Sequence, residues 1–297
     1  MVRTMHVLVT GGSGFVGRAV VSELLKRGRT VTATTYPELR PIPEADWIPW
    51  DATASPLPDA PWDSLDAVIH LALPADPLAV PEQTGPLFDT CVASTFHLLR
   101  KAASTGCIKR VVFISTGTSI GPRTAAVLES DREYRPVAFY GAAKACGEIL
   151  AEAFQKLVST AVVRLYHPYG PGGERFLINR LLRSVQRGRE VFIDGEEGIS
   201  LNPVWLEDAA TGIDLAVASD ARGIFHLGGR ETVTLRQLLA MMGELAGAAP
   251  RTITRPVDVP ESYACDMSRS AAELGYAPAV GLREGLRRLL EIASQTA

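Results

Sequence analysis

The segment FYGAAKACGE (residues 139–148) places a tyrosine and a lysine four positions apart. Ala, Lys and Glu favour helix, and residues at i and i+4 share one helix face, so the Tyr140 hydroxyl and the Lys144 ammonium are expected to lie side by side. An isolated phenol has a pKa of about 10, and a neighbouring cation lowers that pKa toward neutrality. Taken alone, the pair leaves two interpretations open, because the same spacing arises by chance on solvated helix faces, which is the more common case.

Three regularly spaced glycines, Gly11, Gly14 and Gly17, stand between the first predicted strand (6–10) and the first predicted helix (18–28), in VLVTGGSGFVGRAV. Gly11 lets the chain turn, Gly14 lets the backbone approach a pyrophosphate, and Gly17 lets the helix pack closely on the strand. The helix N-terminus then faces the anion with free N–H groups. The loop therefore predicts dinucleotide binding. The expected coenzyme contacts in it are Gly11, Gly14, Phe15, Val16, Gly17 and Arg18.

Short apolar runs alternate with helical patterns over the first 168 residues. Strands are predicted at 6–10, 30–35, 66–72, 109–116 and 160–166, and helices at 18–28, 95–106 and 138–158. These runs do not alternate polar with apolar residues, which is typical of a parallel sheet covered on both faces. The proline-rich stretch 36–62 is interpreted as irregular loop with one short strand. The sequence thus predicts a doubly wound α/β architecture.

Composition excludes several classes of protein. The 297 residues carry a formal net charge of −3, with 46% hydrophobic and 21% charged residues, so a nucleic-acid partner has no electrostatic support. No apolar stretch approaches the roughly 18 residues of a membrane span, and the first residues lack a signal-peptide pattern. The four cysteines and five histidines are scattered, so no metal is expected. We expect a cytoplasmic protein with neither nucleic acid nor membrane as partner.

Six motifs occur in the order found in one known family. The first five are TGGSGFVG, DAVIHLAL, VVFISTGTSIG, FYGAAKACGE and VVRLYHPYGPGG. The sixth consists of two segments, NPVWLEDAA and RPVDVPESYACDMSRSAAELGY. Together they resemble the extended short-chain dehydrogenase/reductase family, the NAD(P)-dependent sugar epimerase/dehydratase group. The resemblance implies a Rossmann-type dinucleotide-binding domain over residues 1–168. It also implies a smaller, mainly substrate-binding lobe over 169–297, from which about 200–228 return to the first domain.

The resemblance also assigns catalytic roles. Tyr140 becomes the general acid/base, Lys144 lowers its pKa, and the Thr116 hydroxyl holds the substrate oxygen. Ser115 is the fallback for Thr116, and the structural alternative for Thr116 is a strand-end residue that bonds backbone. In dehydratases of the family an acid pair follows this threonine, whereas this chain has Gly117 and Thr118. A dehydratase is therefore less favoured than a 4-ketoreductase or a 4-epimerase.

The coenzyme is expected to be NADP, with NAD as the alternative. An acidic residue after the second strand favours NAD, and here that place holds threonines, with Arg18 and Arg40 nearby. Arg40 is equally well interpreted as a solvated loop charge. The further coenzyme contacts implied by the resemblance are Thr35, Arg40, Asp51, Ala52, Leu71, Ala72, Leu73, Ser115, Tyr140, Lys144 and His167.

A nucleotide-linked sugar is the expected substrate, and a homodimer the expected assembly. Arg255 matches an arginine that grips the diphosphate in this family, but Leu201 stands where a second arginine is common. Cys91 and His167 replace common asparagines. The expected substrate contacts are Thr116, Arg175, Phe176, Asn202 and Arg255. The alternatives are a reductase of a small ketone without a nucleotide and a non-catalytic coenzyme-binding regulator, which the retained Tyr140 and Lys144 disfavour.

Overall fold

The computed structural model describes residues 4–35, 42–74, 76–257 and 262–295 of the chain. A seven-stranded parallel sheet forms its centre, in the order β11-β6-β5-β4-β1-β2-β3. The strands are β1 (His6–Thr10), β2 (Thr30–Thr35), β3 (Asp46–Pro49), β4 (Ala67–His70), β5 (Arg110–Thr116), β6 (Ser159–Leu165) and β11 (Gly223–Leu227). This architecture confirms the predicted doubly wound, Rossmann-type fold class. The order reverses beside β1, where β2 pairs on one side and β4 on the other.

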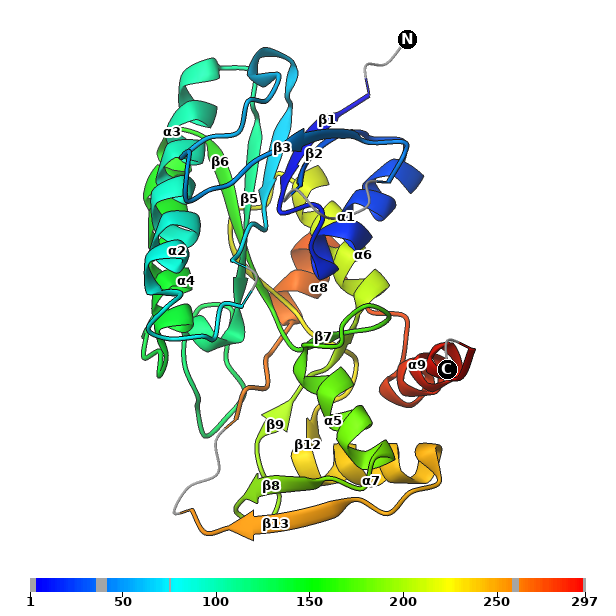
Figure 1. Cartoon of the computed structure of the whole chain (residues 1–297). Coiled ribbons are helices and arrows are strands. Elements are labelled where there is room, and N and C mark those ends of the chain that lie inside the picture. The colour runs from blue at the N-terminus through cyan, green and yellow to red at the C-terminus, as the bar shows by residue number, and fades with distance from the viewer. Residues whose placement is uncertain (1–3, 36–41, 75, 258–261, 296–297) are drawn as a thin grey trace.

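Helices cover both faces of the sheet (Figure 1). On one face lie α2 (Thr84–Phe88), α3 (Ser94–Thr105) and α4 (Phe139–Ala153), with a π-helical turn (Asp89–Ala93) between the first two. On the other lie α1 (Phe15–Lys26), α6 (Leu206–Ala218) and α8 (Ser268–Leu274). The predicted helix stop at Gly106 is confirmed, because this residue takes the left-handed conformation (φ 71°) that glycine allows. Helix α4 is shorter than predicted and passes into a 3-10 turn (Phe154–Lys156).

A small lobe lies beyond the carboxyl ends of the strands, below the sheet in Figure 1. Its elements are α5 (Leu177–Gln186), β8 (Glu190–Asp194), β9 (Ser200–Leu201), β12 (Val233–Thr234), α7 (Leu235–Ala246), β13 (Arg251–Arg255) and α9 (Leu282–Gln295). It has its own apolar cluster, in which Leu182, Leu238 and Leu286 are buried. The short strands β7 (Pro168–Tyr169) and β10 (Val204–Trp205) pair with each other where the lobe meets the sheet.

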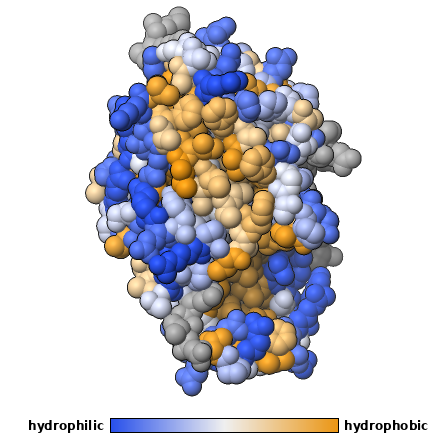
Figure 2. Space-filling view, turned by 90° about the vertical axis from the view of Figure 1, so that its left-hand side faces the viewer, coloured by the Kyte–Doolittle hydropathy of each residue, from blue (hydrophilic) through white to orange (hydrophobic). Residues whose placement is uncertain are grey.

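The outer face of α2, α3 and α4 is apolar over a broad area (Figure 2). Phe88, Phe96 and Ile149 are large apolar side chains of these helices that remain exposed. Among the helices of the described ranges, none is both long and apolar enough to cross a membrane.

Candidate active site

The glycine loop after β1 has the geometry of a pyrophosphate cradle. Gly11 has φ 70°, and its N–H donates to Thr34 Oγ1 at 2.9 Å. A Cβ on Gly17 would lie 2.1 Å from the Gly11 carbonyl oxygen, so close helix–strand packing requires glycine there. A Cβ on Gly14 would approach only that same oxygen, at 3.3 Å, within the described chain. Packing therefore leaves open the space at Gly14 that an anion would use, and no side chain caps the N-terminus of α1.

Sequence reasoning missed two residues that shape this loop. A Cβ on Gly12 would lie 2.8 Å from the Ala33 Cβ, so Gly12 lets the loop approach β2. Thr34 fixes the Gly11 amide. The doubled glycine in the sequence was the available signal for the first. Nothing in the local sequence pattern indicates the second.

The end of β4 borders the same loop. The Ala72 Cα would lie only 2.8 Å from a Cβ on Gly11, and the Leu71 N–H donates to the Thr10 carbonyl oxygen at 3.1 Å. His70 is buried, with Nδ1 2.6 Å from Thr10 Oγ1 and Nε2 3.0 Å from the Thr90 carbonyl oxygen. Burial, helped by the Lys144 ammonium, lowers the pKa of His70 to about 3. His70 is thus a neutral support of the loop, which sequence reasoning did not single out.

Thr116 and Tyr140 meet at the carboxyl end of β5. Thr116 is its last residue, and its Oγ1 accepts a hydrogen bond from the Thr118 N–H at 3.3 Å. Burial raises the pKa of the Tyr140 phenol above its ordinary value, the nearby Cys91 adds to this rise, and a hydrogen bond between the Tyr140 and Thr116 side chains opposes it. These contacts place a protonated phenol beside a second hydroxyl.

Lys144 follows Tyr140 by one turn of α4, as the spacing predicts. Its Nζ donates to the Ile114 carbonyl oxygen at 2.7 Å and lies 4.9 Å from the centre of the Phe113 ring. Burial lowers the pKa of the Lys144 ammonium. Burial is the largest influence on the Tyr140 phenol and raises its pKa, and the lowering of that pKa by Lys144 remains a prediction.

The fallback residue Ser115 faces away from Thr116. Its hydroxyl donates to a carboxylate oxygen of Glu148, in keeping with the alternation of side chains along a strand. Its expected contact with coenzyme remains a prediction.

Two unpaired polar atoms mark the end of β6. Among the described residues, the buried side-chain atoms without a hydrogen-bond partner are Tyr166 Oη, His167 Nδ1 and Ser94 Oγ. His167 has a positive φ of 47°, and burial lowers its pKa to about 4. Buried polar groups are normally paired, so Tyr166 and His167 fit a site where a polar ligand group completes the bonding. His167 follows β6 at the same sheet edge as Thr116, and its contact with coenzyme remains a prediction.

The predicted substrate residues are more dispersed. The Phe176 ring contacts Phe15 at the start of α1, with ring centres 4.4 Å apart and ring planes tilted by 39°, and the neighbouring Arg175 is exposed. The Asn202 amide bonds Thr232 Oγ1 at 2.8 Å and accepts from the Cys265 N–H at 2.9 Å, so it ties three chain segments together.

Arg255 lies on β13, on the outer face of the β8–β13 ribbon. Its guanidinium makes two bonds to the Asp194 carboxylate, at 2.7 and 2.9 Å, and its side chain is 56% exposed. It is therefore engaged within the small lobe, and its expected grip on a diphosphate remains a prediction.

The predicted adenosine contacts are only partly described. Asp51 Oδ1 accepts from the Thr53 N–H and hydroxyl at 2.9 and 2.7 Å, which shapes the turn after β3. Thr35 ends β2, and Arg18 is exposed in the first turn of α1. Arg40 lies outside the described residues.

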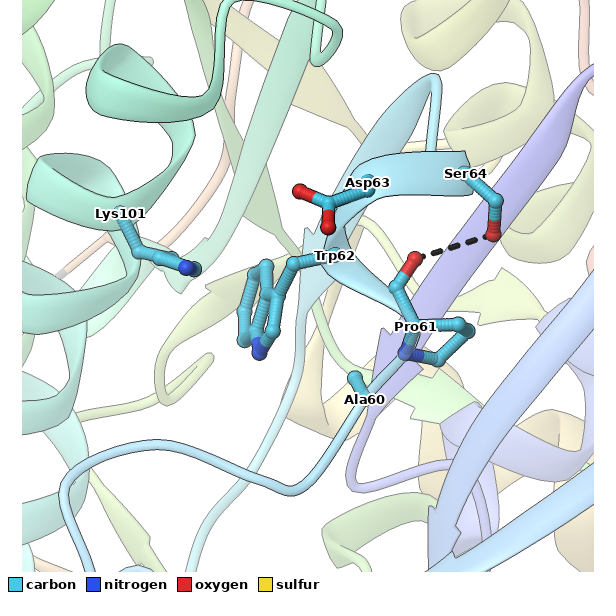
Figure 3. A pocket seen from close by; sticks show the side chains of 6 residues that line it. All are labelled: Ala60, Pro61, Trp62, Asp63, Ser64 and Lys101. Carbon is cyan, nitrogen blue, oxygen red and sulfur yellow. Dashed lines mark hydrogen bonds between the residues drawn. The ribbon is translucent and has the colours of Figure 1, made fainter.

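A surface hollow lies near the amino end of β4, on the side of the sheet opposite to the carboxyl ends of the strands (Figure 3). It is lined by Ala60, Pro61, Trp62, Asp63, Ser64 and Lys101. Lys101 Nζ is 5.9 Å from the centre of the Trp62 ring. The 3-10 turn Trp62–Ser64 precedes β4, whereas ligands of open α/β sheets bind beyond the carboxyl ends of the strands. The hollow is therefore separate from the site around Thr116 and Tyr140.

Known proteins resemble this chain over most of its length. Residues 7–228 match the NAD dependent epimerase/dehydratase family. The chain is 29% identical to a dTDP-glucose 4,6-dehydratase of Streptomyces griseus, over 95% of this chain and 92% of that protein. It is 26% identical to a UDP-glucuronate 4-epimerase of Thermodesulfobacterium geofontis, over 95% and 94%. The structure of MoeE5 in complex with UDP-glucuronic acid and NAD superposes with a TM-score of 0.83 at 27% identity, covering 98% of this chain and 100% of that one.

Proposed function

Because the chain belongs to the NAD dependent epimerase/dehydratase family, we propose that it is an oxidoreductase acting at C4 of a nucleotide-linked sugar through Thr116, Tyr140 and Lys144. The observation that carries the proposal is the placement of Thr116 at the carboxyl end of β5 and of Tyr140 and Lys144 one turn apart on α4, with the Lys144 ammonium bonded to the Ile114 carbonyl oxygen of β5. The glycine loop that fits a pyrophosphate lies at the same sheet edge. The relatives with named activities handle dTDP- and UDP-linked sugars.

The residues divide the chemistry between them. The glycine loop and residues 71–73 would hold the coenzyme, which would supply or accept a hydride when bound. Tyr140 gives a proton to the C4 oxygen, which Thr116 holds by its hydroxyl. Lys144, anchored on the Ile114 carbonyl oxygen, supplies a positive charge one helical turn after Tyr140. Because burial raises the pKa of Tyr140, the phenol is protonated near neutral pH, which is the form that donates.

Reduction of a 4-ketosugar is the function that these contacts favour, since reduction consumes a proton. A 4-epimerase is the second candidate, because it uses the same residues and because the Thermodesulfobacterium relative is one. Dehydration is disfavoured by the turn after Thr116. A Cβ on Gly117 would lie 2.4 Å from the Tyr166 ring, so the acidic side chain that dehydratases place there has no room.

The coenzyme is proposed to be NADP. Thr34 and Thr35 occupy the end of β2, and Arg18 is exposed at the start of α1, where a 2′-phosphate could be paired. MoeE5 binds NAD, which is the alternative. Titrations with NADPH and NADH should give at least tenfold tighter binding of NADPH, since a lost charge-assisted bond to a phosphate costs about 1.5–3 kcal/mol. Equal affinities, or tighter NADH, would overturn the preference.

The active form is proposed to be a cytoplasmic homodimer. The apolar face of α2, α3 and α4 is broad enough to mark an interface, and a second copy of the same face would bury Phe88 and Ile149 (Figure 2). Cys91, Cys107, Cys146 and Cys265 are free thiols, which suits a reducing compartment. Sedimentation should show a dimer for the wild type and a monomer for Ile149→Glu. An unchanged mass for that variant would exclude this face.

The function itself is tested by incubating the purified chain with NADPH and a UDP- or dTDP-linked 4-ketosugar. Consumption of NADPH with formation of a C4 alcohol supports the reductase. Tightly bound NAD released on denaturation, with interconversion of C4 epimers and no net consumption, supports the epimerase instead. Reduction of a phosphate-free ketone with equal efficiency would replace both with the small-ketone reductase.

A further inference from the structure

The buried carboxylate of Glu148 contacts residues on both sides of the turn that carries Thr116. Glu148 lies on α4, one turn after Lys144, and its side chain is fully buried. Its Oε1 accepts hydrogen bonds from the hydroxyls of Ser115 and Ser119. These serines precede and follow Thr116, so one anion holds the turn on both sides of the catalytic hydroxyl.

The same carboxylate reaches the loop that leads into Tyr140. Tyr134 donates its hydroxyl to Glu148 Oε2 at 3.1 Å. Arg164 of β6 pairs with that oxygen at 2.8 Å, and both side chains of the pair are fully buried. Arg164 also donates to the Asp131 carbonyl oxygen at 3.3 Å, and its guanidinium lies 5.8 Å from the centre of the Tyr134 ring. Glu148 thus joins α4, the end of β5, β6 and the loop before α4.

Helix α4 contacts the end of β5 at three successive turns. A Cβ on Gly141 would lie 2.4 Å from the Thr118 carbonyl oxygen, so the first turn packs directly on the catalytic turn. Lys144 bonds the Ile114 carbonyl oxygen. Glu148 bonds Ser115 and Ser119. Of these three contacts, only that of Glu148 bonds side chains on both sides of Thr116.

We propose that Glu148 is a positioning residue, which holds the turn that carries the Thr116 hydroxyl in a fixed place relative to Tyr140 of α4. The inference rests on the proposed function of those two residues. It does not require Glu148 to touch substrate or coenzyme. A merely structural ion pair would support folding without controlling this distance.

Glu148→Gln keeps the shape and one acceptor but weakens the hold on Ser115 and Ser119. We expect kcat to fall by about 10- to 100-fold, because misplacing a reacting group by about 1 Å costs up to 10²-fold. The affinity for NADPH should change less than threefold, since the glycine loop is distant from Glu148 along the sheet. Glu129→Gln is the matched control. Glu129 is also buried and accepts bonds from the N–H groups of His226 and Arg269, at 2.9 and 2.7 Å, but it ties α8 to β11. It should lower thermal stability and leave kcat within threefold.

The decisive test combines Glu148→Gln with Thr116→Val. If Glu148 acts through Thr116, the double variant should be no more than about threefold slower than Thr116→Val alone, because coupled residues are not additive. The proposal would be overturned if the kcat of the double variant fell by the product of the two single-variant factors. It would also be overturned if Glu129→Gln lost as much kcat as Glu148→Gln. Should Glu148→Gln not fold, Glu148→Gln with Arg164→Gln removes both charges and takes its place.

A crystal structure of the same variant gives a readout without activity. The proposal predicts that the Thr116–Tyr140 oxygen separation in Glu148→Gln differs from that in a wild-type crystal structure by about 1 Å, a displacement that costs up to 10²-fold in rate. An unchanged separation would refute positioning by Glu148 while leaving the proposed function intact. Absence of turnover on nucleotide-linked sugars in the wild type would refute the proposed function and leave this measurement valid.

Discussion

Two arginine–carboxylate pairs of similar geometry lie in opposite surroundings. Arg164 and Glu148 pair at 2.8 Å under the sheet edge with no exposure, whereas Arg255 and Asp194 pair at 2.7 Å on the small lobe with side chains 56% and 46% exposed. An exposed pair contributes at most about 1 kcal/mol and can exchange partners, while breaking a buried one costs about 3–5 kcal/mol. Burial therefore makes the first pair a fixed part of the site and leaves the second available to a charged ligand.

The largest effect is expected on turnover, at the site beside the buried Arg164–Glu148 pair. Tyr140→Phe removes the proton donor with little change in packing, so turnover should fall by about 10²–10⁴-fold while coenzyme affinity stays close to that of the wild type. Steady-state rates and coenzyme titration measure the two quantities. Near-normal turnover in Tyr140→Phe would remove this residue from the mechanism.

The ion pairs themselves are compared by truncating each carboxylate. Glu148→Ala leaves the Arg164 guanidinium buried and unpaired, so the free energy of unfolding should drop by about 3–5 kcal/mol. Asp194→Ala should cost less than about 1 kcal/mol. Urea denaturation of both variants gives the values. Similar losses in the two variants would contradict the assigned difference.

The free energy of unfolding should fall at acid pH because two buried histidines of the sheet resist protonation in the folded chain. Burial lowers the pKa of His70 and of His226 to about 3 each. An unfolded imidazole has a pKa of about 6.5, so the unfolded chain binds more protons below that pH. The stabilisation is complete above about pH 6.5 and falls toward pH 3, by about 1.4 kcal/mol per pH unit for each histidine.

Denaturation midpoints between pH 7 and pH 5 measure this slope. His226→Gln should have a slope shallower by one proton than the wild type. An identical slope would show that His226 is protonated in the folded state.

The effect expected at the exposed pair concerns substrate binding and is smaller than that of Tyr140→Phe. Arg255→Ala should raise the Michaelis constant for a nucleotide-linked sugar by about ten- to a hundredfold, since it removes a charged contact worth about 1.5–3 kcal/mol. The effect on turnover should be smaller. Asp194→Asn is the matched change, because it frees Arg255 and should lower that constant. No change in either variant would leave Arg255 as a surface ion pair.

The sequence predicted the parts of this site that depend on local pattern. The five strand predictions agree with β1, β2, β4, β5 and β6 within two residues at each end, because buried parallel strands are continuous apolar runs. The glycine spacing predicted the turn at Gly11 and the close packing at Gly17.

The contacts that the sequence did not predict are long-range. Glu148 and Arg164 lie 16 residues apart on different elements, and no periodicity pairs them. The raised pKa of Tyr140 follows from burial by neighbouring segments, which spacing within one helix does not reveal. A side chain at position 117 lacks space because of the Tyr166 ring, which belongs to a distant part of the sequence.

The most direct test of the central claim compares two substrates. The ratio of kcat to KM should be measured for a UDP- or dTDP-linked 4-ketosugar and for the corresponding free ketosugar, in the wild type and in Tyr140→Phe. We expect the nucleotide-linked sugar to be at least about tenfold better in the wild type, by the charged diphosphate contact, and both activities to be lost in Tyr140→Phe. Equal efficiency on the two ketones, or activity that survives in Tyr140→Phe, would contradict the account.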